Sequence, residues 1–190
     1  EHKRLRSTDI LRRVSVAPVR GRANALRTRL RGEALALARD EQLLAAAYSY
    51  RIVPLEEPAA PTLRAGGEIL HAPRLLPESG QLTALGCAVC TVGPLIEARV
   101  RSLFDEKRPS LALALEGLGN ELLFEVSRRV QDRMLAVAVR QGLTFGGELR
   151  AGRRCKYLWH RRRIPCGDRE VQRRGECEMV VACAQGGRVG

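Results

Sequence analysis

The sequence predicts a domain of mixed helices and strands, because segments with the two-residue period of strands are followed by segments with the helical period. With 190 residues and a mass of 21.0 kDa, the chain has the size of one domain. Hydrophobic residues make up 45% of the chain, which suffices for a core, whereas aromatic residues make up only 4%. The core is therefore expected to consist of Leu, Val and Ala.

The first half of the chain is expected to contain one helix and three strands. Apolar residues recur at helical spacing over 22–39. Strand patterns cover three segments, 48–53, 68–71 and 84–92. Pro54 is expected to limit the first strand, since proline cannot donate a hydrogen bond to a neighbouring strand. The Pro- and Ala-rich stretch 56–61 is expected to be a loop.

The clearest boundary in the chain is the pair Gly93-Pro94, which follows the strand at 84–92. Gly93 permits a tight turn, and Pro94 suits the first turn of a helix. A helix is expected over 95–107, and a long second helix over 111–141. Leu143 is expected to begin a further strand.

The net charge of +12 is concentrated at the two ends of the chain. Residues 1–39 carry +8, residues 40–150 carry −2, and residues 151–190 carry +6. Arginine-rich ends can bind phosphate groups by releasing counterions. The sequence lacks aromatic residues interleaved for base stacking and lacks zinc-finger spacing, so a solvated arginine-rich surface is the preferred interpretation and nucleic-acid binding the less favoured one.

The sequence predicts neither a membrane span nor a secretion signal. No apolar run reaches the roughly eighteen residues that a spanning helix requires. The chain does not open with a charged stretch, an apolar stretch and a cleavage site. We therefore expect a cytoplasmic protein with reduced thiols.

Six cysteines occur, and two of them, Cys87 and Cys90, form a CxxC pair. Such a pair suggests a redox centre or half of a zinc site. However, the pair lies in an apolar run that predicts a buried strand, and residues three apart on a strand point to opposite faces. Two buried, separate thiols are therefore the favoured interpretation.

Residues 153–190 differ in texture from residues 1–152, so the sequence predicts a folded domain followed by a basic, poorly structured tail. This tail contains four of the six cysteines and the only tryptophan, Trp159. Strand periodicity is limited to 179–183. Two origins stay open: a divergent but genuine ending, and an arginine-rich product of a GC-rich gene read out of frame.

The segments around the Gly-Pro boundary resemble a known family signature, "CTIGP…EERV…LF". The matching residues are Val89-Cys90-Thr91-Val92-Gly93-Pro94, Glu97-Ala98-Arg99-Val100 and Leu103-Phe104. This signature is that of the activation domain of cobalamin-dependent methionine synthase and its free-standing relatives. The resemblance covers roughly residues 20–152 in layout and is specific mainly over 88–122.

This resemblance implies an α+β fold, in which a twisted, mainly antiparallel sheet is flanked by helices. It also implies an accessory module that binds S-adenosylmethionine and supports the reductive remethylation of cobalamin. The cobalamin would be held by a partner, either a corrinoid-binding protein or a methyltransferase subunit. A flavodoxin-like protein would supply the electron.

Several ligand groups of the family are replaced in this chain. We aligned the family's loop after its long helix to this chain without gaps. Glu148 then falls where the family has Arg, and Arg153 falls where it has Tyr. Gly152 is the one matching residue in that loop. Phe124 replaces an acidic residue of the long helix, although a phenyl ring cannot accept a hydrogen bond from an amino group. The family scaffold is therefore matched better than the family's ligand set.

The candidate cosubstrate-binding residues are Glu116, Asn120 and Gly152. Glu116 and Asn120 lie one turn apart on the expected long helix, although exposed polar residues are common on helices. Two alternatives to the methyltransferase module stay open: a degenerate partner module that binds no cosubstrate, and a basic nucleic-acid-binding protein. No metal site and no catalytic residue is predicted.

Overall fold

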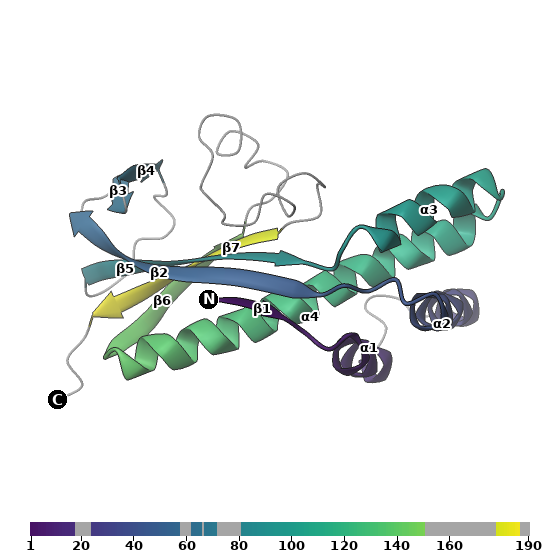
Figure 1. Cartoon of the computed structure of the whole chain (residues 1–190), viewed down its shortest axis with the longest axis horizontal. Helices are drawn as coiled ribbons and strands as arrows, with labels where there is room; N and C mark the ends of the chain where they lie inside the picture. Colours follow the sequence, from purple (N-terminus) through teal and green to yellow (C-terminus); the bar gives the residue numbers. More distant parts are fainter. Residues whose placement is uncertain (18–23, 58–61, 66, 72–80, 151–177, 187–190) are drawn as a thin grey trace.

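A computed structural model describes residues 1–17, 24–57, 62–65, 67–71, 81–150 and 178–186. Within this part of the chain the fold is α+β, as the resemblance implies: four helices accompany a seven-stranded antiparallel sheet (Figure 1). The elements in chain order are β1 (His2–Arg4), α1 (Ser7–Val16), α2 (Ala25–Asp40), β2 (Ala47–Glu57), β3 (Thr62–Ala65), β4 (Glu68–His71), β5 (Gln81–Thr91), α3 (Leu95–Asp105), α4 (Pro109–Arg140), β6 (Leu143–Arg150) and β7 (Glu178–Gly186).

The strand order in the sheet is β4-β3-β2-β5-β7-β6, with β1 paired to β2 at one side. β7 thus lies between β5 and β6, where it pairs Glu178 with Cys90 and Ala182 with Glu148. β7 is the described part of the segment 153–190, and it contains the stretch 179–183 that showed strand periodicity.

The core lies where α4 meets the other helices and one face of the sheet. The amino-terminal half of α4 runs among α1, α2 and α3, and its carboxyl-terminal half continues under the strands (Figure 1). Alternate residues of β2 and β5 enter this core, among them Tyr48 and Cys90, which are 4% and 0% exposed. Leu122 and Val126 of α4 are also completely buried. Leu, Val and Ala predominate in the core, as their abundance predicts.

The turn from β5 into α3 depends on Gly93. Its φ angle of +88° lies in the left-handed region, and a Cβ atom at this position would lie 2.8 Å from Cβ of Ala45. Only glycine therefore fits here, because it has no side chain to strain the backbone or collide. Further on, a Cβ at Gly119 would lie 3.2 Å from Ile96, so α3 and α4 approach each other closely.

Most predicted elements are confirmed with small shifts at their ends, but Pro54 does not limit its strand. β2 continues to Glu57, and Pro54 pairs with Ala84 of β5. On its other side β2 pairs with β1 before this point and with β3 after it, so Pro54 falls in a gap between those partners. An absent N–H costs least at such an edge. The prediction of a loop over 56–61 is therefore wrong for Glu56 and Glu57, which belong to β2, and residues 58–61 lie outside the described residues.

Candidate functional site

The buried residues of the family signature have a structural role in the fold. Cys90 and Leu103 are completely buried, and Val92 is 4% exposed. None of these side chains offers a group to a ligand, because each packs inside the core. The signature therefore specifies the passage from sheet to helix.

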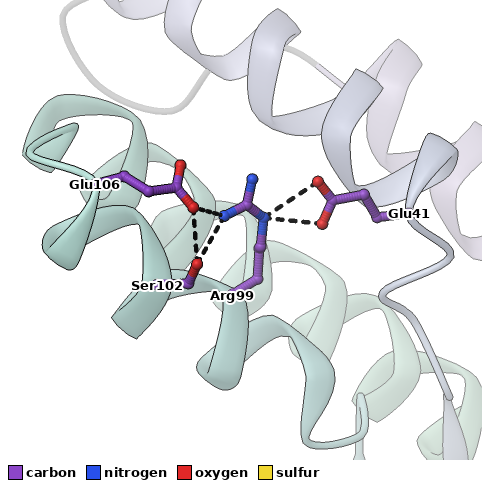
Figure 2. A network of polar contacts seen from close by, with 4 residues as sticks. All are labelled: Glu41, Arg99, Ser102 and Glu106. Atoms are coloured by element: carbon purple, nitrogen blue, oxygen red, sulfur yellow. Dashed lines mark hydrogen bonds and ion pairs between the residues drawn. The ribbon is translucent and has the colours of Figure 1, made fainter.

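Arg99, the arginine of the signature, holds helices together (Figure 2). Its Nε donates to the carboxylate of Glu41 at 2.8 Å, beyond the end of α2. Its Nη1 donates to Oγ of Ser102 at 3.0 Å and also to the carboxylate of Glu106. The Ser102 hydroxyl donates to Glu106 at 2.8 Å. We call these four residues the Arg99 clamp.

Hydrogen bonds and charges within the Arg99 clamp shift the pKa values of its members. The hydrogen bond from Ser102, followed by that from Arg99, lowers the pKa of Glu106. Glu106 and Glu41 raise the pKa of Arg99. Since the Arg99 side chain is only 19% exposed and pairs with a carboxylate on each side, Arg99 has a structural role.

Glu116 and Asn120 lie on the exposed surface of α4, one turn apart, as predicted. Neither side chain is held by a hydrogen bond or ion pair to another residue in the described part of the chain. The third predicted residue, Gly152, lies outside the described residues, as does Arg153. Glu148 lies in β6, opposite Ala182 of β7.

Two residues that the sequence analysis missed extend the line of Glu116 and Asn120. At 3.6 residues per turn, Ser127 and Gln131 fall on the same strip of α4, roughly 22 Å from end to end. Ser127 is completely buried, and its hydroxyl has no hydrogen-bond partner among the described residues. The side-chain nitrogen Nε2 of Gln131 is also buried without a partner. We call Glu116, Asn120, Ser127 and Gln131 the α4 polar strip.

The unsatisfied groups of the strip are costly. A buried polar group without a hydrogen bond costs about 1–3 kcal/mol, so such groups in a folded protein require an explanation. The one other buried side-chain N or O atom of the described residues without a partner, Oγ1 of Thr83, lies on β5 at a shift in strand register. The members of the strip are spaced four, seven and four residues apart, and this helical spacing is the pattern in the sequence from which the strip could be recognised.

Phe124 lies on the same side of α4, between the exposed and the buried members of the strip. Its side chain is 37% exposed, so the ring is partly accessible. Because it cannot accept a hydrogen bond, it does not supply the acidic group that the resemblance implies. The strip thus has polar groups at both ends and an aromatic ring between them.

The two cysteines of the CxxC pair lie on opposite faces of β5. Cys90 is buried in the core on the helix side, whereas Cys87, at odd spacing on the same strand, is outside that core cluster. Burial raises the pKa of the Cys87 thiol, which disfavours the reactive thiolate. The predicted divergence of the two thiols is confirmed.

Two further polar clusters serve the scaffold. Arg31 of α2 donates to Glu121 of α4 at 2.8 Å and to the carbonyl oxygen of Val14 of α1 at 2.6 Å, which joins three helices. The Tyr50 hydroxyl donates to Glu1 at 2.9 Å, and this hydrogen bond lowers the pKa of Glu1. These charges are satisfied internally.

Among the described residues, no three His, Cys, Asp or Glu side chains gather closely enough to bind a metal ion. In the same part of the chain, no helix combines the length and apolar character needed to cross a membrane. Neither a scan against protein-family models nor a search of curated proteins finds a match to this chain.

Proposed function

We propose that the chain is an accessory module of a corrinoid-dependent methyltransferase of the methionine synthase type. The observation that carries this proposal is the signature resemblance over 88–122 at the Gly93-Pro94 turn, where β5 passes into α3. The α+β fold is of the class that the resemblance implies. The scaffold thus supports the proposal.

The exposed end of the α4 polar strip, formed by Glu116 and Asn120, is the proposed binding surface for S-adenosylmethionine. Ser127 Oγ and Gln131 Nε2 are buried, so they are not accessible to a ligand on this surface. Glu116 and the side-chain oxygen of Asn120 are acceptors, which suits an ammonium group. Gly152 belongs to the proposed site through the resemblance. The exposed end of the strip therefore fits the ammonium group of the cosubstrate.

The role of the chain in this proposal is positioning. S-adenosylmethionine supplies a methyl group, and the cobalt of a cobalamin held by the partner carries the chemistry. The residues of the strip would orient the cosubstrate, which reduces the entropy cost of the transfer. The proposed partners are a corrinoid-binding protein or methyltransferase subunit and a flavodoxin-like reductant, and the proposed compartment is the cytoplasm.

Phe124 favours a second candidate, a partner module that binds no cosubstrate. The ring stands where the resemblance implies an acidic group, and Glu148 stands where it implies an arginine. A carboxylate at that position would repel the carboxylate of the cosubstrate instead of binding it.

Titration calorimetry with S-adenosylmethionine decides between the two candidates. Binding is expected for the unaltered chain, and Glu116→Gln or Asn120→Ala is expected to weaken it about tenfold, as loss of one hydrogen bond to a charged ligand does. Arg140→Gln, near the far end of α4, is the control and should bind like the unaltered chain. No heat at millimolar cosubstrate would eliminate the first candidate and leave the second.

A further inference from the structure

The exposed residues near the start of α4 gather in one small patch. Within residues 111–120, the exposed ones are Leu113, Glu116, Gly117 and Asn120. Each lies three or four residues from two of the others, so on a helix they are neighbours on one face, about 10 Å long. Glu116 and Asn120 are also the exposed members of the α4 polar strip. We call these four residues the Gly117 patch.

Gly117 leaves the helix backbone open within this patch. A Cβ atom at this position would have no atom within 4 Å, whereas a Cβ at Gly119 would lie 3.2 Å from Ile96. The packing of the described residues therefore gives no reason for glycine at 117, although glycine destabilises the interior of a helix. Glycine at such a place allows a ligand to approach the backbone closely.

Gly32 of α2 provides a comparison, because a Cβ atom there would also meet open space. Its neighbour Glu33 forms an ion pair with Arg29 at 3.4 Å. Glu116, the neighbour of Gly117, makes no hydrogen bond or ion pair with another residue in the described part of the chain. An open backbone beside an unused carboxylate is thus found at Gly117 and not at Gly32.

The chemistry and size of the Gly117 patch suit a small cation with an aliphatic part. Leu113 is 59% exposed and offers an apolar contact. Glu116 and Asn120 offer hydrogen-bond acceptors, and the patch contains no basic side chain that would suit a phosphate. A stable protein interface needs roughly 800 Å² on each partner, which is far more than four residues on two turns of a helix provide.

We propose that the Gly117 patch binds the methionyl part of S-adenosylmethionine and prefers this sulfonium to its thioether counterpart, S-adenosylhomocysteine. The inference rests on the proposed function, and it adds Leu113 and Gly117 to the residues that determine specificity. Glu116 and Asn120 accept from the ammonium group, while Gly117 and Leu113 contact the methylene chain.

The unpaired carboxylate of Glu116 accounts for the preference. The length of the methionyl chain puts its sulfur about 6 Å from a carboxylate that pairs with its ammonium group, and at this distance in water a positive sulfur is favoured about threefold over a neutral one. The effect decreases as salt screens the two charges.

Titration calorimetry of the full chain at low salt compares the two compounds. We expect S-adenosylmethionine to bind about threefold more tightly than S-adenosylhomocysteine, and Glu116→Gln to remove this difference. Gly117→Leu should weaken the binding of both compounds about tenfold, because its side chain fills the space above the backbone. Gly32→Leu is the matched control and should bind both like the unaltered chain.

Competition identifies which part of the cosubstrate lies on the patch. S-methylmethionine carries the ammonium and sulfonium groups without adenosine, and it should displace S-adenosylmethionine, whereas adenosine should not. Displacement by adenosine alone would overturn the inference. Cooperative unfolding curves establish that each variant is folded.

Two kinds of failure can be told apart. Undiminished binding by Gly117→Leu, or a preference for the sulfonium that survives in Glu116→Gln, would overturn this inference and leave the proposed function intact. Absence of any heat when the unaltered chain is titrated with S-adenosylmethionine would overturn the proposed function and this inference with it.

Discussion

The Arg99 clamp and the α4 polar strip differ in how far their polar groups are hydrogen-bonded. In the clamp, one guanidinium group engages two carboxylates and a hydroxyl. In the strip, two members are exposed and two are buried with polar atoms that lack partners among the described residues. The clamp contains the signature arginine, whereas the strip lies within and beyond the end of the resembling segment.

This contrast shows that resemblance to a family can be carried by scaffold residues alone. A network of paired charges stabilises one arrangement of helices. An unsatisfied buried group lowers stability, because it has lost its hydrogen bonds to water without replacing them. Stability measurements can therefore separate the two regions.

The largest effect is expected at the turn that leads into the clamp. Gly93→Ala should lower the free energy of unfolding by about 3 kcal/mol, because it combines left-handed backbone strain with a collision against Ala45. Urea unfolding measures this change. Gly142→Ala is the control: its φ of +70° is similar but its surroundings are open, so about 1 kcal/mol is expected. Equal losses would show that the Ala45 contact is unimportant.

The strip should respond to mutation with a gain in stability. Ser127→Ala removes a buried hydroxyl that has no partner, so the free energy of unfolding should rise by about 1 kcal/mol. The same substitution in the clamp, Ser102→Ala, should lower it by about 0.5 kcal/mol, because that hydroxyl is hydrogen-bonded. Thermal or urea unfolding of the two variants gives the signs, and a loss at Ser127 would contradict our account of the strip.

Arg99→Ala should lower the free energy of unfolding by about 1 kcal/mol, because several hydrogen bonds and the packing of a mostly buried side chain are lost together. Arg101→Ala offers a comparison on the same helix. Arg101 pairs only with Glu97 and is 72% exposed, so a loss of about 0.3 kcal/mol is expected. If the two losses were equal, the clamp would be no more than a surface ion pair.

The smallest effect concerns pH. The pKa of Glu106 is lowered in the folded chain, chiefly by the hydrogen bond from Ser102. Its contribution to stability is therefore present above the ordinary glutamate range and is lost as the pH falls through the lowered value. The difference in unfolding free energy between the unaltered chain and Glu106→Gln should shrink on acidification. A difference that stays constant with pH would contradict this role for Glu106.

The sequence predicts the elements whose signals are local. Gly93-Pro94 marks a strand-to-helix turn in any context, and the long apolar stripe of α4 identifies a helix by itself. α1 and β3 were not predicted, since the short β3 gains its order from pairing with β2 and β4. Pro54 was misjudged, because whether proline is tolerated depends on which strand edge is free.

The candidate site shows the same limit. Glu116 and Asn120 could be chosen because exposed polar residues one turn apart are visible in the sequence. The burial of Ser127 and Gln131 depends on how α4 lies against the rest of the fold, which no local pattern reveals. The Arg99 clamp was likewise hidden, since Arg99 and Glu41 meet only through the packing of α3 beside the end of α2.

The position of β7 has a consequence for how the chain acquires its shape during synthesis. One side of β5 stays unpaired until β7 is synthesised, about 90 residues further along the chain. Closing so long a loop slows folding. Until that strand leaves the ribosome, one side of β5 remains open to wrong partners. We therefore expect the nascent chain to need chaperone protection until translation has passed residue 186.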